Sequence, residues 1–271
     1  MPKLLFCDID GTLVRSDGTI SDHVRDLLEK LAYQGHGFIL TSGRPLSSIL
    51  KVRGYIDIAF PHSYIIANNG GLIYDCNAKN AVFEARLPLA LIDELQNLAE
   101  EMKIHIQTYT ETDIVCCTET EEVKRYAERI KMPVIFSDRL TSPLKIAPYK
   151  MLALSLKGSD ALMPLKHRIE SDYADTINPM FSQNGYLELL PKSASKGNAL
   201  RFLCKHLNIP VSDTYAVGDS ENDIAMLRAA AISYAMQNGD EIVKSSAAFI
   251  TALDHNHDGI AEVLHRILEA S

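Results

Sequence analysis

Near its start the chain reads Leu4-Leu5-Phe6-Cys7-Asp8-Ile9-Asp10-Gly11-Thr12-Leu13. The short apolar run predicts a buried strand, and two carboxylates follow at its end. In an extended chain residues i and i+2 point the same way, about 6.5 to 7 Å apart. Carboxylates are rarely buried without partners, so the pair indicates a metal or a reaction. The alternative is a strand that ends in a solvated Asp-Gly turn.

Composition narrows the class of protein. The 271 residues are 46% hydrophobic and 23% charged, as in ordinary globular proteins. The net charge of −8 argues against a nonspecific nucleic-acid surface, so an anionic substrate needs local positive charge or a metal. No apolar run approaches the ~18 residues of a membrane span, and the apolar start is too short for a signal peptide. We therefore expect a cytoplasmic protein without a membrane or nucleic-acid partner.

The cysteines indicate no metal or disulfide framework. There are five, an odd number, and none lies in a C-x-x-C pattern. We expect reduced thiols of a cytosolic protein and no zinc site.

Strand and helix patterns alternate at both ends of the chain, which favours an α/β fold with a doubly wound parallel sheet. One helix is expected after the N-cap Ser21 and before Gly35. The expected strands are 4–9, 37–41, 64–67, 214–217 and 232–235, with a short one at 249–250, and the expected helices are 22–34, 196–207, 222–230 and 260–268.

The middle of the chain has a different character. Amphipathic helix patterns mix there with strand-like runs at 105–108, 114–117, 151–156 and 186–190. This pattern predicts an α+β domain, residues 82–191, inserted into a core made of 1–81 and 192–271.

Polar clusters occur at four points, each at the carboxyl end of an expected core strand or at the start of the next helix. In a doubly wound sheet these ends share one ligand-binding crevice. Together they offer the carboxylates, hydroxyl, ammonium and amide donors that magnesium-dependent phosphoryl transfer uses. The clusters are Asp8 with Asp10, Ser42-Gly43, Lys196-Gly197, and Gly218-Asp219-Ser220-Glu221-Asn222-Asp223.

These four clusters, in this order, resemble the four motifs of the haloacid dehalogenase superfamily. The Gly-Asp-Ser-x-Asn-Asp form and the inserted cap are similar to its Cof-type phosphatases, as is the closing Asp258-Gly259-Ile260-Ala261. The resemblance implies a Rossmann-like core, Mg²⁺ as cofactor and a small phosphorylated metabolite, sugar phosphates foremost, as substrate. A large cap leaves little room for protein substrates.

The resemblance also implies roles for single residues. Asp8 would be the nucleophile that forms an aspartyl-phosphate. Asp10 would protonate the leaving oxygen and then activate water, while its backbone carbonyl binds the metal. Asp8 and Asp219 would ligate Mg²⁺ directly, and Asp223 would hold a metal-bound water or orient Lys196. The phosphate-binding groups would be the backbone N–H groups of Ile9 and Gly43 and the side chains of Ser42, Lys196 and Asn222.

Other residues carry weaker signals. Arg44 has no fixed role in the resemblance, and Asn68-Asn69-Gly70-Gly71 is either part of the crevice or an ordinary turn. Glu188 could face a substrate. The run His255-Asn256-His257-Asp258 mimics metal ligands but lies outside the four motifs.

Three other functions stay open at this point. A phosphomutase or phosphotransferase would share Asp8 and Asp10 but pass the phosphoryl group to a sugar hydroxyl. A phospho-acceptor signalling module would keep its aspartyl-phosphate, against which Asp10 argues. A sugar-phosphate sensor with vestigial activity is the third. The sequence leaves the substrate and the oligomeric state open.

Overall fold

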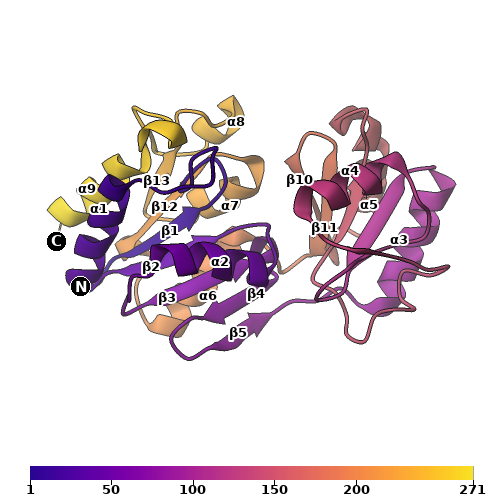
Figure 1. The fold of residues 1–271 in the computed structure, drawn as a ribbon, viewed down its shortest axis with the longest axis horizontal. Helices are drawn as coiled ribbons and strands as arrows, with labels where there is room; N and C mark the ends of the chain where they lie inside the picture. Colours follow the sequence, from indigo (N-terminus) through magenta and orange to yellow (C-terminus); the bar gives the residue numbers. More distant parts are fainter. Residues whose placement is uncertain (271) are drawn as a thin grey trace. The chain divides into compact units, whose positions relative to one another are not determined.

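The structure, a computed structural model, describes residues 1–270 and divides into two compact units. The first unit joins Met1–Glu84 to the chain from Ala194 onward, and the second is Ala85–Ser193. The ribbon in Figure 1 shows both. No helix among the described residues combines the length and apolar character needed to cross a bilayer.

The first unit is built on one eight-stranded sheet, with strand order β14-β13-β12-β1-β2-β3-β4-β5. The strands from β14 to β3 pair in parallel, while β4 and β5 add an antiparallel edge. This topology confirms the expected α/β class. The strands are β1 (Leu4–Asp8), β2 (Gly37–Thr41), β3 (Ser63–Ala67), β4 (Leu72–Asp75), β5 (Asn80–Glu84), β12 (Thr214–Gly218), β13 (Ile232–Ala235) and β14 (Phe249–Ile250).

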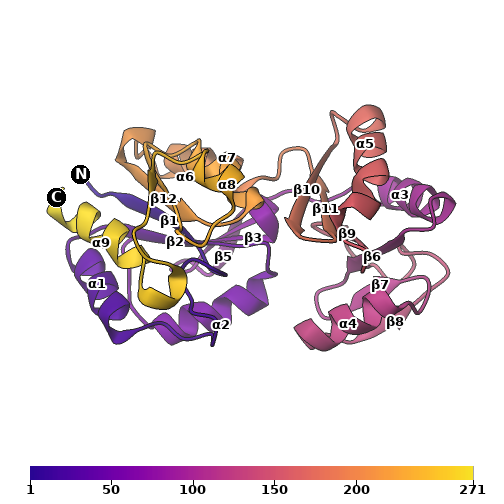
Figure 2. The same ribbon diagram turned by 90° about the horizontal axis from the view of Figure 1, so that it is seen from above.

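Helices cover both faces of this sheet. Figure 2 shows α1, α2 and α9 on one side and α6 and α7 on the other. A parallel sheet needs this double cover because both of its faces are apolar. The helices are α1 (Asp22–Tyr33), α2 (Leu46–Ile56), α6 (Lys196–Leu207), α7 (Ile224–Leu227), α8 (Glu241–Lys244) and α9 (Ile260–Glu269), with 3-10 turns η1 (Asn68–Gly70), η3 (Val211–Asp213), η4 (Glu221–Asp223) and η5 (His255–His257).

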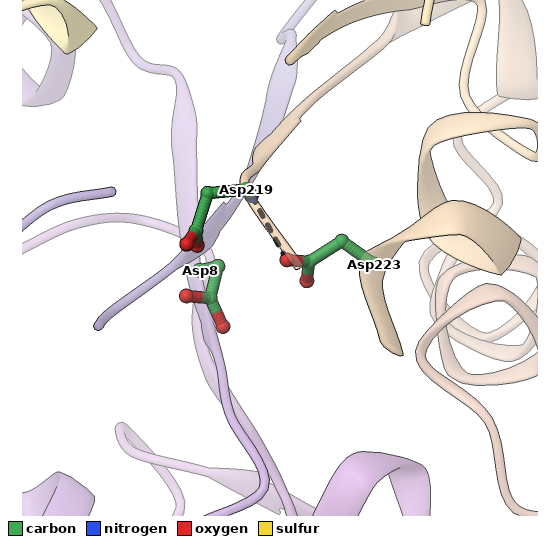
Figure 3. Close-up of side chains that lie close together, drawn as sticks. All are labelled: Asp8, Asp219 and Asp223. Carbon is green, nitrogen blue, oxygen red and sulfur yellow. Dashed lines mark hydrogen bonds between the residues drawn. The ribbon is translucent and has the colours of Figure 1, made fainter. Parts of the chain in front are cut away.

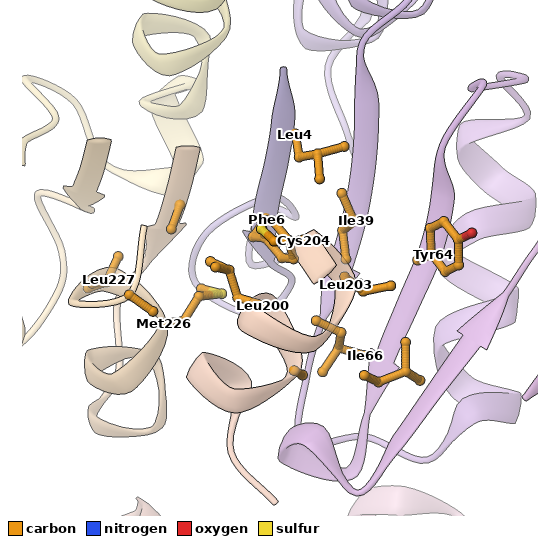
Figure 4. Packing of buried hydrophobic residues seen from close by; sticks show 14 of the residues in the cluster. Leu4, Phe6, Ile39, Tyr64, Ile66, Leu200, Leu203, Cys204, Met226 and Leu227 are labelled. Carbon is orange, nitrogen blue, oxygen red and sulfur yellow. The ribbon is translucent and has the colours of Figure 1, made fainter. Parts of the chain in front are cut away.

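A buried apolar cluster fixes α6 against the sheet. Phe6 of β1 and Ile39 of β2 lie in one cluster with Leu200 and Leu203 of α6 (Figure 4). All four side chains are buried, and each contributes about 1.5 to 3 kcal/mol on removal from water. The packing therefore holds the first turn of α6 at the carboxyl ends of the strands.

The second unit is a six-stranded sheet in the order β10-β11-β9-β6-β7-β8, mostly antiparallel. Its largest apolar cluster includes Leu95 of α3 and Leu165 of α5. The elements are α3 (Leu89–Glu101), β6 (His105–Tyr109), β7 (Ile114–Cys116), α4 (Glu121–Ile130), β8 (Val134–Phe136), β9 (Met151–Leu154), η2 (Ser159–Leu162), α5 (Met163–Asp172), β10 (Ile177–Gln183) and β11 (Tyr186–Pro191).

The structure contains several elements that the sequence did not predict, among them α2, β8 and α8, and it differs from the expectations in further places. The expected helix 222–230 is instead η4 followed by the single-turn α7. The antiparallel strands β4 and β5 were not expected. Neither was β10, whose Pro179 is tolerated because this strand lies at the sheet edge.

Candidate active site

Three carboxylates meet at the carboxyl ends of β1 and β12. These strands pair in parallel with Cys7 opposite Val217, so Asp8 ends β1 close to where Asp219 follows β12. Asp223 approaches from η4, and one oxygen of each acid lies within 4.8 Å of the others. Figure 3 shows the three side chains converging. Among the described residues they are the one group of three His, Cys, Asp or Glu placed to share a metal.

Lys196 supplies the positive charge at this cluster. It is the first residue of α6, and the N-cap Ser195 accepts the Asn198 N–H at 3.0 Å. The buried Nζ of Lys196 donates to Asp223 Oδ1 at 2.5 Å and also to Asp8 Oδ1. Burial alone would lower the pKa of Lys196, but the charges of Asp223 and Asp8 outweigh it and raise the pKa above its usual value. The ammonium is therefore kept.

Asp223 uses both of its oxygens inside the protein. While Oδ1 accepts from Lys196, Oδ2 accepts the backbone N–H groups of Asp219 and Ser220, each at 3.1 Å. A Cβ on Gly218 would lie 2.4 Å from Asp223 Cγ, so only glycine fits there. Together with the Ser220 side chain, the bond from the Ser220 N–H forms a capping box at the start of η4, so Asp223 is fixed in this loop.

Asp8 and Asp219, the other two acids, lie in a region of excess negative charge. Burial and then the charge of Asp223 raise the pKa of Asp8 well above its usual value. The same two causes raise the pKa of Asp219 to about 7. One ammonium does not neutralise three carboxylates, so the cluster favours an added cation. Oxygen ligands of this kind suit Mg²⁺.

Asp10 lies beside this cluster and pairs with Arg44. The Arg44 Nε donates to Asp10 Oδ2 at 2.7 Å, and a second guanidinium nitrogen donates to Oδ1. The Asp10 side chain is about half exposed. Gly11 turns the chain here with a φ of +75°, and a Cβ on it would lie 2.5 Å from Asp219 Oδ2. The bidentate partner was not predicted from the sequence.

The loop after β2 forms another side of the site. Ser42 is buried, and its Oγ accepts the Arg44 N–H at 3.1 Å. Its backbone carbonyl accepts the N–H of Asn69 at 3.0 Å. The Asn222 side-chain amide in turn donates to Asn69 Oδ1 at 3.0 Å. The structure thus links Ser42 and Asn222 through the Asn-Asn-Gly-Gly turn.

One further residue was missed by the sequence reasoning. The Thr12 hydroxyl donates to Asp219 Oδ1 at 3.1 Å and is fully buried. In the sequence, only its place directly after Asp10-Gly11 marks Thr12 as a site residue.

Two weaker candidates lie outside the acidic cluster. Glu188 belongs to the second unit and forms a buried ion pair with Lys150 at 3.1 Å. Asp258 accepts from Arg15 and from Ser21, each at 2.9 Å, which ties the loop after β1 to the loop before α9. The run from His255 to Asp258 therefore has a local structural use.

Known proteins are similar to this chain in sequence and in fold. A family model described as haloacid dehalogenase-like hydrolase matches residues 5–264. Phosphatase YwpJ of Bacillus subtilis is 26% identical over 297 residues, which cover 98% of this chain and all of that protein. The crystal structure of a haloacid dehalogenase-like hydrolase from Bacteroides thetaiotaomicron is 29% identical, with a TM-score of 0.84 and coverage of 98% and 100%.

A further structure supports the fold alone. It is the structure of a subclass IIB sugar phosphatase of the same superfamily, with 23% identity, a TM-score of 0.79, and coverage of 97% of this chain and 98% of that one. The family-model match spans nearly the whole chain and confirms the superfamily indicated by the four motifs, as well as the expected hydrolase class. The chain belongs to the family of haloacid dehalogenase-like hydrolases.

Proposed function

We propose that the protein is a magnesium-dependent phosphatase that hydrolyses small phosphorylated metabolites, with sugar phosphates as the leading class. The observation that carries this proposal is the buried group of Asp8, Asp219 and Asp223 around Lys196 at the strand ends. It combines a nucleophile, a cation site and a fixed ammonium at the carboxyl ends of β1 and β12. The named relatives are phosphatases, which supports the same conclusion.

Asp8 acts as the nucleophile. One carboxylate oxygen forms a bond to phosphorus while the bond from phosphorus to the ester oxygen breaks, which yields an aspartyl-phosphate. Asp10 gives its proton to the departing oxygen. It then takes a proton from water, whose oxygen attacks the phosphorus, and the phosphate leaves with Asp8 restored. Asp10 must leave its ion pair with Arg44 during this cycle, because both of its oxygens are occupied there.

The oxygen ligands fit a magnesium ion. Asp8 and Asp219 would be the direct carboxylate ligands, and the backbone carbonyl of Asp10 would be a third ligand. We place Asp223 in the outer set, where its oxygens hold the Lys196 ammonium and two backbone N–H groups. A bound Mg²⁺ would offset the negative charge of the phosphoryl group and of these acids.

The phosphate lies among donors from four loops. Lys196 is the charged donor. The Ser42 hydroxyl, the Asn222 amide and the backbone N–H groups of Ile9 and Gly43 complete the set. Fixed donors of this kind stabilise the charge that develops in phosphoryl transfer.

The two units divide the work between chemistry and selection. We assign catalysis to the core, residues 1–81 and 192–271, and substrate selection to the inserted cap, residues 82–191. A cytoplasmic location accords with five cysteines that form no disulfide among the described residues.

A screen of phosphorylated metabolites with phosphate release as the readout tests this function. We expect release from a sugar monophosphate that is abolished by EDTA and restored by Mg²⁺. Release without any bisphosphate cofactor separates a phosphatase from a phosphomutase. Turnover that persists without divalent metal would overturn the magnesium assignment, and no release from any monoester would overturn the phosphatase assignment.

A further inference from the structure

The turn after β3 touches three of the four loops that build the site. Its backbone N–H groups reach the loop after β2: Asn68 N donates to the Arg44 carbonyl and Asn69 N to the Ser42 carbonyl, both at 3.0 Å. These two hydrogen bonds, to the carbonyls of Arg44 and Ser42, fix the backbone conformation of the Ser42-Gly43-Arg44 segment. The side chain of Asn69 also packs on Gly43, where a Cβ would come within 3.0 Å of Asn69 Nδ2.

The same turn lies against the start of α6. Gly70 has a φ of +96°, and a Cβ on it would lie 2.4 Å from the carbonyl oxygen of Ser195. Ser195 is the N-cap residue directly before Lys196. The turn therefore limits where the first residue of α6 can lie.

The third contact runs from Asn69 to Asn222. Asn222 Nδ2 donates to Asn69 Oδ1 at 3.0 Å, and both side chains are buried. This bond fixes which way the Asn222 amide points. The second side-chain N–H of Asn222 and its Oδ1 remain for other partners. Asn222 Oδ1 is buried and has no hydrogen-bond partner among the described residues. An amide held in this way offers defined atoms to a ligand.

The backbone of the turn is unusual for non-glycine residues. Asn68 and Asn69 have φ values of 50° and 53° in succession, the left-handed region that L-residues rarely enter. Such conformations persist where the surroundings over-determine them, and they gather at functional sites. Asparagine tolerates this region, which explains why the pair stands here.

We propose that Asn69 is a positioning residue of the phosphate site: its side-chain oxygen orients the Asn222 amide, and its backbone N–H sets the Ser42-Gly43 loop. The proposal rests on the proposed function, since both partners are assigned there to phosphate. Asn69 itself acts through these partners.

Replacement of Asn69 by glycine removes the side chain and keeps the left-handed backbone free of strain. Asn208 offers a matched control: it is the exposed C-cap residue of α6, with φ 54° and ψ 37°, against 53° and 34° for Asn69. We expect Asn69→Gly to lower kcat/KM for a generic phosphate monoester about 10-fold to 100-fold and to weaken competitive inhibition by inorganic phosphate. Asn208→Gly should change neither.

A double-mutant cycle separates positioning from general structural damage. If Asn69 acts mainly through Asn222, then Asn69→Gly costs far less in an Asn222→Ala background than in the wild type. Equal costs in both backgrounds would overturn the proposal, as would an unchanged kcat/KM in Asn69→Gly.

A measurement without turnover keeps this proposal distinct from the proposed function. The side-chain NH₂ signals of Asn222, assigned by their loss in Asn222→Ala, should include one slowly exchanging proton in the wild type. That protection should disappear in Asn69→Gly and persist in Asn208→Gly. Equal exchange in the wild type and Asn69→Gly would overturn the positioning role even in an active phosphatase. An inactive wild type with the expected exchange would overturn the phosphatase assignment and leave the positioning of Asn222 standing.

Discussion

The side-chain nitrogen of Lys196 lies 2.5 Å from Asp223 Oδ1, and neither side chain is exposed to solvent. The same nitrogen donates to Asp8, so one buried ammonium serves two buried carboxylates. The residue that begins α6 thereby joins the first and last motifs of the chain. Both the stability of the first unit and its proposed chemistry depend on this pair of contacts.

Lys196→Met should destabilise the first unit strongly. The change leaves Asp8 and Asp223 buried without their cation, and loss of one partner of a buried pair typically costs about 3 to 5 kcal/mol. Urea unfolding followed by circular dichroism measures the loss. The control is Lys205→Met, an exposed lysine of the same helix, for which we expect a change below about 0.5 kcal/mol. A loss below about 1 kcal/mol in Lys196→Met would contradict the buried link.

Two helical glycines should respond to alanine in opposite directions. Gly→Ala in a helix usually stabilises it by about 1 kcal/mol. At Gly54 of α2 a Cβ meets nothing within 4 Å, so Gly54→Ala should raise the melting temperature. At Gly197 of α6 the Cβ would lie 2.3 Å from the backbone oxygen of Ala225, and Gly197→Ala should lower it. Stabilisation by both changes would show that α6 and α7 are not this close.

His36 should make stability fall in mild acid. Its Nδ1 accepts the Lys3 N–H at 3.0 Å, and burial followed by the charge of Lys3 lowers its pKa below the usual 6.5. Below about pH 6.5 the unfolded chain then binds more protons than the native one, so the free energy of unfolding falls as the pH decreases. One histidine accounts for at most about 1.4 kcal/mol per pH unit.

The measurement for His36 is a series of unfolding curves between pH 7 and 5. His36→Gln should flatten the decline relative to the wild type, because glutamine keeps an acceptor that does not titrate in this range. Parallel slopes for the wild type and His36→Gln would rule out this contribution.

The strand ends were predictable from sequence, because their chemistry is local. Asp8 and Asp219 each follow an apolar run that packs into the sheet, and parallel strands bring such ends to one edge. The start of α6 was equally predictable, because Ser195 is a typical N-cap residue and Lys196 follows it as the first residue of the helix. These features gave the fold class and the residues of the acidic cluster.

Contacts between distant loops could not be predicted in the same way. The partner of Asp10 is Arg44, and that of Asn69 is Asn222, 153 positions away. Neither pair has a spacing or periodicity that marks it. The short η4 and α7 were not predicted either, although the Ser220–Asp223 capping box that starts η4 is a local sequence pattern.

The central claim is that Asp8 performs the chemistry, and the most direct test is the rate of phosphate release from p-nitrophenyl phosphate by wild type and Asp8→Asn, both with Mg²⁺. Asparagine keeps the size of the side chain but supplies no carboxylate nucleophile. We expect a loss of about 1000-fold or more with an unchanged circular dichroism spectrum, whereas Asp26→Asn on the exposed face of α1 keeps the wild-type rate. Wild-type phosphate release by folded Asp8→Asn would contradict the account.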